Sequence, residues 1–533
     1  MSAPTSAHPW LPDQGDGTYR NPVLHADYSD PDAIRVGDTY WMTASSFTAT
    51  PGLPILRSRD LVNWELVNHA IRQVPHASYA AVRPGCGVWA PSIRHHAGLF
   101  WIFFPMPDEG IYVTTAADPL GEWCEPWLLQ AAKGWIDPCP FWDADGSAWL
   151  FHAFANSRSG KRDRIHVRPM SPDGRQLLGE GVEIIHAPHH PYLEGPKLHQ
   201  RDGWYYLMAP GGGVPTGWQV AFRSRCITGP YEEKIVLETG STTINGPHQG
   251  AFVDTPTGEW WFLHFQDLSA FGRIVHLQPV VWPTGAEWPQ VGVDLDGNGV
   301  GEPVASAKNA LLVPGAPRFA PATSDDFDAP KLGLQWQWQG NHAPAWADLT
   351  ARAGWLRLVA QPANVERLDM NAHLLLQKFP ARTFTVSTLI EVPDAVEGGV
   401  DVFAGLVVVG GGASACIAVK SAPEGRRLVC RLGDVNVLDW PVMAGTIHLR
   451  VRVGADGSCV FGYAGPKGIF AELPNVFVAQ EGGWMGAKVG LFASGEAGYA
   501  DFDHFNLSAT FSEAVTQRAH EDAQRPLREA DAP

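Results

Sequence analysis

The stretch that decides the fold reads Gly203-Trp204-Tyr205-Tyr206-Leu207-Met208, a turn glycine followed by a run of aromatic and aliphatic residues. Four further copies of this pattern occur in the first three hundred residues. They read Gly37-Asp38-Thr39-Tyr40-Trp41-Met42, Gly98-Leu99-Phe100-Trp101-Ile102-Phe103, Gly146-Ser147-Ala148-Trp149-Leu150-Phe151 and Gly258-Glu259-Trp260-Trp261-Phe262-Leu263. Successive turn glycines lie 48 to 61 residues apart, about the length of a four-stranded propeller blade with its loops. The alternative is that these runs are ordinary hairpins of a β-sandwich; five copies at this spacing favour a five-bladed β-propeller.

Size and composition limit the remaining possibilities. A chain of 533 residues is longer than one hydrophobic core usually supports, so two domains are expected. The hydrophobic share of 45%, the charged share of 18% and the many glycines and prolines are typical of turn-rich, all-β architecture. With a formal net charge of −17 and no Lys/Arg stripe, nucleic acid and anionic membranes are disfavoured as partners.

Cysteine usage and the first residues bear on the compartment. The seven cysteines are scattered without a C-x-x-C pair, so neither a disulfide framework nor a zinc site is predicted, and a reducing compartment is favoured. Residues 1–16 carry no basic and apolar signal regions, and no stretch reaches the length of a membrane-spanning helix, so we expect a cytoplasmic protein. The sequence leaves a homo-oligomer open.

The sequence pattern changes after the fifth copy, which indicates a domain boundary. Residues 1–310 are assigned to the propeller, residues 324–510 to a C-terminal β-sandwich, and residues 511–533 to a polar tail. The sandwich is predicted from short runs that alternate apolar and polar residues, such as Ile447-His-Leu-Arg-Val-Arg-Val453. Near the junction, Asp294-x-Asp296-x-Asn298-Gly299 is similar to the start of a calcium-binding EF-hand loop. Its twelfth position is Ala305 instead of Glu, which argues against calcium there.

A polar or aromatic residue precedes each turn glycine, beside or near a proline. Proline cannot donate to a sheet ladder, so it marks the start of a strand. Since the innermost strands of a propeller converge on its axis, these five residues are expected to surround one pit. They are Asp30, Trp89, Asp137, Glu194 and His248.

Three carboxyl groups at the predicted pit point to acetal hydrolysis, which needs two carboxyl groups in different protonation states. We expect Asp30 to be the ionised general base that activates water. Glu194, among aromatic residues, is expected to have a raised pKa and to act as the general acid. Asp137 is expected to raise the pKa of that acid and to orient it.

Other residues are candidates for substrate and metal binding. Arg273 is expected to clamp a sugar hydroxyl or to hold Asp30 ionised, and the alternative is a structural ion pair. Phe47 and Trp89 offer flat apolar faces for a sugar ring or simply fill the core. His248 is either the ligand of a cation or a hydrogen-bonded core histidine.

At this point the residues resemble family 43 of the glycoside hydrolases. The run from Tyr19 to Asp38 is similar to the opening of that family, and its later landmarks are matched along the propeller. Residues after Leu332 and around Tyr499 resemble the β-sandwich of its β-xylosidase branch. The matching landmarks are Val88-Trp89-Ala-Pro-Ser, Trp135-Ile-Asp137-Pro, Leu193-Glu194-Gly-Pro and Gly246-Pro-His248-Gln-Gly.

The resemblance implies an inverting hydrolase that releases xylose or arabinose from xylo-oligosaccharides or arabinoxylan fragments. It implies base Asp30, modulator Asp137, acid Glu194, Arg273 near the substrate and a hydrated calcium or similar ion beside His248, with no cofactor needed for the chemistry. One departure is Asp32, an extra acid where many members have serine; it leaves the preferred sugar open.

Alternatives to this interpretation remain at the sequence level. Inserts such as the run from Thr48 to Pro54 are expected to close one side of the pit, which favours exo cleavage. The rival of another class is a non-catalytic sugar-binding propeller, and the nearer rival is a retaining hydrolase.

Overall fold

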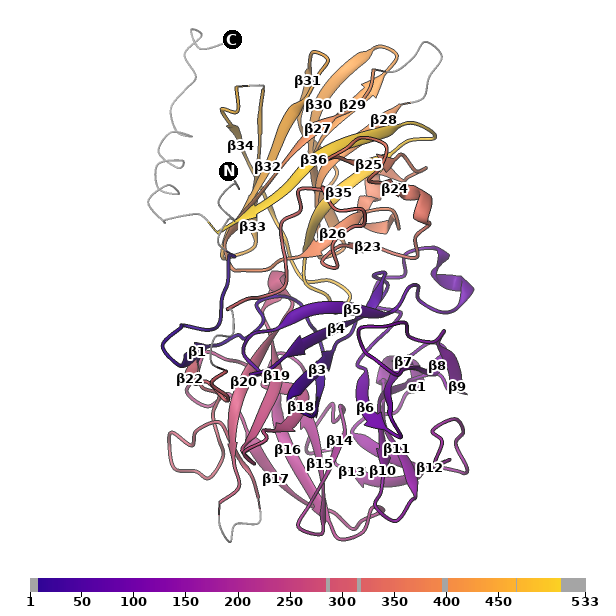
Figure 1. Ribbon diagram of the computed structural model, residues 1–533, viewed down its shortest axis with the longest axis vertical. Coiled ribbons are helices and arrows are strands. Elements are labelled where there is room, and N and C mark those ends of the chain that lie inside the picture. Colours follow the sequence, from indigo (N-terminus) through magenta and orange to yellow (C-terminus); the bar gives the residue numbers. More distant parts are fainter. Residues whose placement is uncertain (1–7, 284–287, 314–317, 395–400, 466, 510–533) are drawn as a thin grey trace.

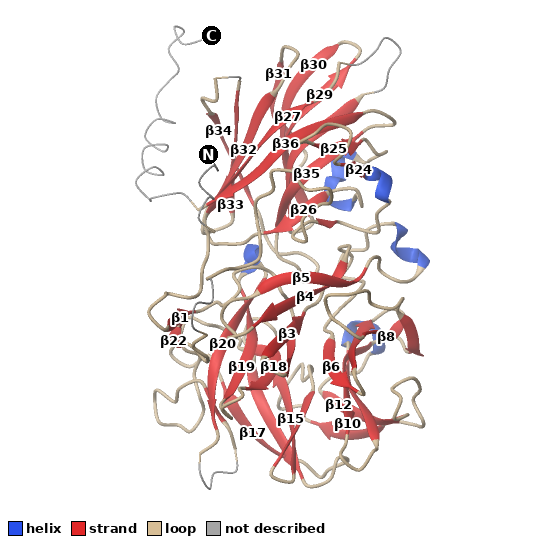
Figure 2. Cartoon of the chain, viewed as in Figure 1, coloured by secondary structure: helices blue, strands red, loops and turns tan. Residues whose placement is uncertain are grey.

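The computed structural model describes residues 8–283, 288–313, 318–394, 401–465 and 467–509, so the predicted tail at 511–533 lies outside the described residues. The chain forms a lower domain from its N-terminal part and an upper domain from its C-terminal part (Figure 1). Strands make up nearly all regular structure (Figure 2). The described helices are short: η1 (Ala77–Ala80), α1 (Asn156–Ser159), η2 (Ser269–Phe271), η3 (Pro344–Trp346) and η4 (Val365–Met370).

The lower domain is a five-bladed β-propeller, which confirms the predicted fold. Each blade is an antiparallel sheet of four strands that are consecutive in sequence. Blades 1 and 2 are β2 (Asp32–Val36), β3 (Thr39–Thr43), β4 (Gly52–Ser58), β5 (Glu65–Ile71) and β6 (Ser92–His96), β7 (Leu99–Met106), β8 (Gly110–Ala116), β9 (Trp127–Ala131). Blade 3 is β10 (Trp135–Trp142), β11 (Ala148–Phe154), β12 (Arg164–Met170) and β13 (Val182–His186). Blades 4 and 5 are β14 (Lys197–Arg201), β15 (Trp204–Gly211), β16 (Trp218–Ser224), β17 (Glu232–Leu237) and β18 (His248–Asp254), β19 (Trp260–Asp267), β20 (Arg273–Val281), β21 (Gln290–Val291).

The five turn glycines join the first and second strand of each blade, and their backbone explains why they are glycines. All five have a positive φ, between 64° and 89°, a region that a residue with a Cβ adopts only at a cost. Each turn is followed by a buried aromatic and aliphatic strand that packs between blades. The repeat in the sequence is therefore a repeat of turn geometry.

The ring closes between blades 5 and 1. Strand β18 lies against β2, while β2 also lies against β6, so the innermost strands follow one another around the axis. Between these two strands, Arg35 of β2 pairs with Asp254 of β18 at 2.5 Å. The small sheet of β1 (Thr18–Arg20) and β22 (Ser306–Lys308) joins the two ends of the propeller segment.

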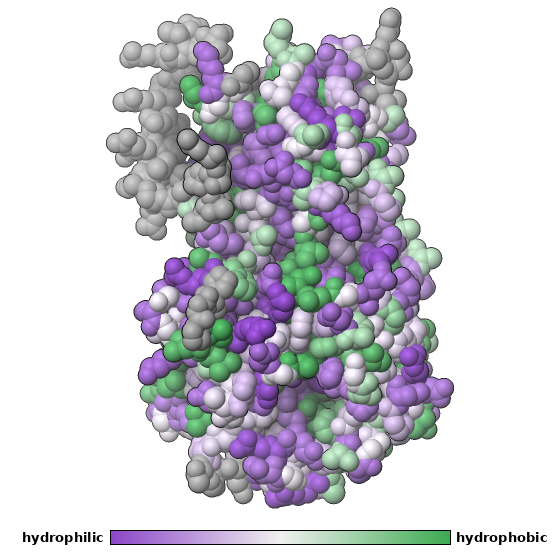
Figure 3. Space-filling view, in the orientation of Figure 1, coloured by the Kyte–Doolittle hydropathy of each residue, from purple (hydrophilic) through white to green (hydrophobic). Residues whose placement is uncertain are grey.

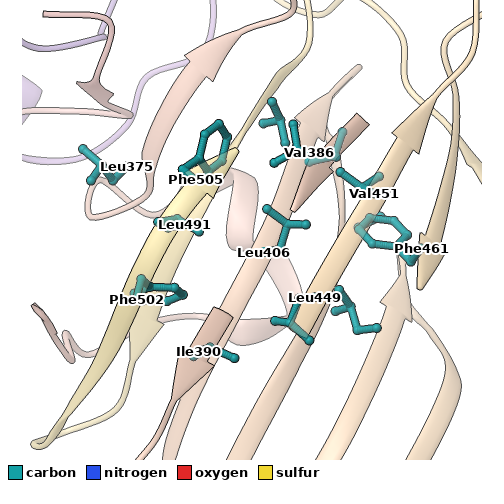
Figure 4. Packing of buried hydrophobic residues seen from close by; sticks show 14 of the residues in the cluster. Leu375, Val386, Ile390, Leu406, Leu449, Val451, Phe461, Leu491, Phe502 and Phe505 are labelled. Carbon is teal, nitrogen blue, oxygen red and sulfur yellow. The ribbon is translucent and has the colours of Figure 1, made fainter. Parts of the chain in front are cut away.

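The upper domain is a sandwich of two seven-stranded sheets. One sheet has the order β23 (Gln337–Trp338), β26 (Leu375–Lys378), β35 (Lys488–Ser494), β28 (Val402–Gly410), β29 (Ala413–Ala422), β30 (Gly425–Leu432), β31 (Val435–Pro441). The other has the order β24 (Ala347–Asp348), β25 (Leu356–Val359), β36 (Tyr499–Ser508), β27 (Phe384–Glu391), β32 (Ile447–Val453), β33 (Ser458–Ala464), β34 (Ala471–Val478). Apolar side chains of both sheets, among them Leu406, Leu449 and Phe502, form one buried core (Figure 4). The predicted alternation thus reflects one face of each strand pointing into this core.

The two domains are joined by backbone contacts on two sides. In blade 1, Thr50 forms a β-bridge with Trp338 of the sandwich. In blade 5, the carbonyl of Ala270 accepts a hydrogen bond of 2.7 Å from the N–H of Ala487, just before β35. The segment from Thr48 to Pro51 therefore contacts the sandwich, which stacks on the propeller (Figure 1).

The visible surface mixes hydrophilic and hydrophobic residues (Figure 3). Within the described part of the chain, no helix combines the length and the apolar character needed to cross a bilayer.

Candidate active site

Six of the seven predicted site residues line one cavity of about 440 Å³ on the propeller axis: Asp30, Asp137, Glu194, Phe47, Trp89 and Arg273. A cavity of this size fits a small ligand. Asp30, Trp89 and Glu194 lie two or three residues before the innermost strands of blades 1, 2 and 4, and Asp137 is the third residue of the innermost strand of blade 3. The structure therefore brings three carboxyl groups, one guanidinium group and two aromatic rings together.

Two of the three acids sit on an unusual backbone. Asp30 and Asp137 both have positive φ, 54° and 55°, and each precedes a proline. Left-handed conformations of this kind cost on the order of 1–3 kcal/mol each and concentrate at functional sites. In blade 4 the corresponding position is Gly195, with φ 58°. Glu194 is therefore one residue earlier than the other acids in its blade, and its longer side chain reaches the same cavity.

Asp30 is held by three donors. The hydroxyls of Ser29 and Ser45 donate to its Oδ2 at 2.8 and 2.6 Å, and Nη1 of Arg273 donates to its Oδ1 at 2.9 Å. Arg273 also donates to the Ser29 hydroxyl at 3.0 Å. Both members of the ion pair are buried. The carboxylate thus has a fixed orientation and a partner of opposite charge.

Asp137 has a different environment from Asp30. Its side chain is buried, and its Oδ2 accepts a hydrogen bond of 2.7 Å from the N–H of Gly195. Burial, with the charge of Asp30 as a smaller contribution, raises its pKa to about 7, although the Gly195 hydrogen bond, Lys197 and Gln249 oppose the shift. Asp137 was predicted to act on the pKa of Glu194; the structure adds that Asp137 itself changes charge near neutral pH.

Glu194 is suited to hold a proton. Burial raises its pKa well above the ordinary value, the charges of Asp137 and Asp30 raise it further, and Arg273 opposes them. The side chain nevertheless keeps 26% of its surface exposed to the cavity. It is a protonated carboxyl group that a ligand can reach.

We expect Asp137→Asn to move the alkaline limb of the kcat/KM profile to lower pH. After burial, the charge of Asp137 is the largest cause of the raised pKa of Glu194. Without that charge Glu194 loses its proton at lower pH, and a general acid acts only while protonated. Values of kcat/KM measured from about pH 5 to about pH 9 locate this limb. An alkaline limb at the same pH in both proteins would contradict the effect of Asp137 on the pKa of Glu194.

The same variant is expected to be more stable than the natural protein at neutral and alkaline pH. The pKa of Asp137 is about 7 in the folded protein instead of the ordinary 3.8. At a pH between these two values, Asp137 keeps its proton in the folded protein but has lost it in the unfolded chain. Stability therefore falls as pH rises through this window, by an amount on the order of a few kcal/mol. The Tm difference between Asp137→Asn and the natural protein should grow from about pH 4 to about pH 7 and then level off. A difference that is independent of pH would refute this.

One wall of the cavity comes from the other domain. Trp484, in the loop before β35, lines the cavity with Phe47 and Trp89. The ring centroid of Trp484 lies 6.4 Å from that of Trp89. The guanidinium carbon of Arg273 lies 5.6 Å from the same Trp484 centroid. Sequence reasoning missed Trp484, because nothing in Gly482-Gly483-Trp484 indicates that it faces a site whose other residues lie more than two hundred positions earlier in the chain.

Further lining residues were also missed, and two of them lie beside predicted residues. Tyr192, two positions before Glu194, and Gln249, directly after His248, both line the cavity and both have positive φ, 60° and 36°. Their nearness to predicted residues is the one signal that could have identified them.

His248 lies beside the cavity instead of lining it. Its ring is fully buried, and Nε2 is 3.7 Å from Oε1 of Glu194. Burial lowers its pKa to about 3, so the ring is neutral, and neither ring nitrogen has a hydrogen-bond partner among the described residues. Calcium prefers six to eight oxygen ligands, and the described residues place no group of three or more His, Cys, Asp or Glu ligand atoms around His248. This donor set does not form a calcium site made of protein ligands alone. The hydrated ion expected beside His248, which would take most of its ligands from water, stays a prediction.

Asp32, the extra acid beside Asp30, has a structural role. Its carboxylate is buried and receives 2.7 and 2.9 Å hydrogen bonds from Arg94 and from the N–H of Ile93. Lys197 lies 3.6 Å away. Asp32 is therefore a bridge between blades and does not line the cavity.

Known proteins match both domains. The family model of glycosyl hydrolases family 43 matches residues 19–289, and that of the β-xylosidase C-terminal concanavalin A-like domain matches residues 324–508. A provisionally named β-xylosidase of Xylanibacter ruminicola is 48% identical over 69% of this chain and 67% of its own. A β-xylosidase of Formosa agariphila is 31% identical over 95% of this chain and 93% of its own.

More distant relatives share the two-domain arrangement. An α-L-arabinofuranosidase of Bacteroides ovatus, named as acting at non-reducing ends, is 26% identical over 92% of this chain and 94% of its own. The solved structure of a bifunctional protein from Bacteroides eggerthii superposes with a TM-score of 0.79 at 28% identity, over 92% of this chain and 64% of that larger chain. With its propeller, its sandwich and the acids at its axis, this chain belongs to family 43 of the glycoside hydrolases.

Proposed function

We propose that this enzyme is an inverting, exo-acting hydrolase that removes single xylose or arabinose units from the non-reducing ends of xylo-oligosaccharides or arabinoxylan fragments. The observation that carries the proposal is the arrangement of three carboxyl groups in one cavity, where Asp30 is paired with a cation while burial keeps Glu194 protonated. The relatives named for xylosides and arabinofuranosides support the choice of sugar.

The proposed reaction breaks one glycosidic bond in a single displacement. Glu194 donates its proton to the leaving glycosidic oxygen as that bond breaks. Asp30 accepts a proton from a water molecule whose oxygen forms the new bond to the anomeric carbon from the opposite face. The products are the released sugar, with inverted anomeric configuration, and the shortened oligosaccharide, whose new hydroxyl carries the proton from Glu194. Arg273 keeps Asp30 oriented, and the charge of Asp137 keeps the proton on Glu194.

The shape of the cavity supports exo cleavage. Trp484 and Phe47 stand on its walls, and the sandwich lies over this side of the propeller, which leaves a pit in place of an open groove. A pit accepts the end of a chain, and aromatic walls offer stacking faces to a sugar ring. An acidic protein of net charge −17 is poorly suited to polyanions, so we propose neutral oligosaccharides as the natural substrates.

The experiment is an assay on 4-nitrophenyl β-xyloside and 4-nitrophenyl α-arabinofuranoside side by side, followed by ¹H NMR of the first sugar released. Turnover of at least one substrate with inverted anomeric configuration is the expected result. Retention of configuration would mean that Asp30 is a nucleophile, a geometry in which the two carboxyl groups lie ~5–5.5 Å apart instead of ~6.5–9.5 Å. Absence of turnover on both would refute the substrate class.

A further inference from the structure

One buried carboxylate outside the cavity connects the two domains to the site. Asp27 lies three residues before Asp30 and is 5% exposed. Its Oδ1 accepts a hydrogen bond of 3.0 Å from the backbone N–H of Arg273, and its Oδ2 accepts one of 2.9 Å from the backbone N–H of Gly486. A single side chain thus joins a strand of blade 5 to a loop of the sandwich.

Each segment that Asp27 holds carries a cavity residue. The side chain of Arg273 binds Asp30. Gly486 is two residues from Trp484, which stands in a tight turn closed by mutual hydrogen bonds between Gly482 and Met485. Trp484 has φ 72° in this turn, a conformation that costs energy for a tryptophan. The turn therefore needs external contacts to keep the ring in the cavity wall.

The contact around Asp27 leaves no room for another side chain. A Cβ on Gly272 would lie 2.5 Å from Cγ of Asp27, and a Cβ on Gly486 would lie 2.5 Å from the backbone N of Gly272. The two glycines bring the two backbones close enough for one carboxylate to reach both N–H groups. Small shifts of this junction are transmitted directly to Arg273 and to Trp484.

Two buried lysines of the sandwich interact electrostatically with Asp27. Lys378 and Lys488 are cross-strand neighbours in β26 and β35. Burial lowers the pKa of both lysines, that of Lys488 to about 7, and the charge of Asp27 opposes the shift in each case. Burial and the neighbouring Asp267 raise the pKa of Glu481 to about 7, and the charge of Asp27 adds a smaller contribution. An anion at position 27 is therefore part of the domain contact, in addition to its two hydrogen bonds.

We propose that Asp27 is a positioning residue through which the β-sandwich sets the geometry of the sugar-binding cavity, by fixing the backbones that carry Arg273 and Trp484. It touches neither substrate nor reacting atoms. This inference rests on the proposed function, because it assigns Arg273 to the base and Trp484 to the sugar-binding wall.

The test is a double-mutant cycle of Asp27→Asn and Trp484→Ala, with Asp254→Asn as the control. Asn keeps the shape and one acceptor but loses the charge and the second acceptor. We expect Asp27→Asn to raise KM and to lower kcat/KM between about 10- and 100-fold. In the Trp484→Ala background its effect on KM should largely disappear, because coupled residues are not additive. Asp254 is another acid at a contact between segments, because it pairs with Arg35 between blades 5 and 1 outside the cavity, and its variant should leave kcat/KM unchanged.

The pH profile separates positioning from a purely structural or electrostatic role. If Arg273 is displaced, it supports the charge of Asp30 less well, so the acidic limb of kcat/KM should move to higher pH. Removing a negative charge without displacement would move that limb to lower pH, and a merely structural role would lower Tm and leave the limb in place. Either of these results, or additive effects on KM, would overturn the proposal.

A second variant and a measurement without turnover keep the test decisive. Gly486→Ala leaves Asp27 intact but places a Cβ against Gly272, and it should raise KM as Asp27→Asn does. Hydrogen exchange of the segment that contains Gly486 and Ala487 should be faster in Asp27→Asn and unchanged in Asp254→Asn. A natural protein that is inactive on both aryl glycosides would refute the proposed function, whereas an active one with unchanged exchange in Asp27→Asn would refute this inference alone.

Discussion

Glu194→Gln is expected to lower kcat on glycosides with poor leaving groups, such as xylobiose, by about 10²- to 10⁴-fold, the contribution of a general acid. Glutamine has nearly the same shape but no proton to give. The loss should be much smaller on aryl glycosides with good leaving groups, because a nitrophenolate departs without protonation. KM should change little, since the cavity walls formed by Phe47, Trp89 and Trp484 are untouched.

A matched control is available in the same domain. Glu302 is a buried glutamate whose carboxylate accepts hydrogen bonds from the N–H and hydroxyl of Ser241, away from the cavity. Glu302→Gln should retain kcat on both kinds of substrate. Steady-state kinetics on xylobiose and on 4-nitrophenyl xyloside decide the matter. Equal losses on both substrates would mean that Glu194 does not protonate the leaving group.

Much of the fold could be predicted because its signals are local. A positive φ at each turn, as at Gly37 and Gly258, favours glycine at that position, and the following strand must be apolar to pack between blades. Both requirements appear directly in the sequence. Pro31 directly precedes β2, whereas Pro138 lies inside β10, at a shift of its register. Both positions are compatible with a residue that cannot donate to the sheet, so the prolines indicated where the acids lie in each blade.

The features that could not be predicted depend on contacts between distant segments. Trp484 reaches the cavity only because the loop that carries it docks on blade 5 near Ala270, and no local pattern indicates that docking. The sequence shows Asp32 as an extra acid beside Asp30. Its position outside the cavity depends on contacts with Arg94 and Lys197 in two other blades, which the sequence does not show. The pKa of Asp137 likewise depends on how deeply its blade is buried, which a sequence pattern does not specify.

Asp30→Asn is expected to lower kcat by about 10²- to 10⁴-fold. The loss should be similar for substrates with good and with poor leaving groups. Asparagine still accepts hydrogen bonds from Ser29 and Ser45, but it cannot take a proton from water, and every substrate needs that step. The insensitivity to the leaving group distinguishes this variant from Glu194→Gln.

The neighbouring acid provides the control for this experiment. Asp30 and Asp32 are two residues apart, both are buried, and each pairs with an arginine, at 2.9 Å to Arg273 and at 2.7 Å to Arg94. Removing one partner of a buried pair is destabilising in either case, so both variants should have a lower Tm. Only Asp30 faces the cavity, so Asp32→Asn should keep kcat per folded molecule within a few-fold of the natural enzyme. If both variants lose kcat alike after correction for the folded fraction, the loss in Asp30→Asn reflects broken packing, and Asp30 is not the base.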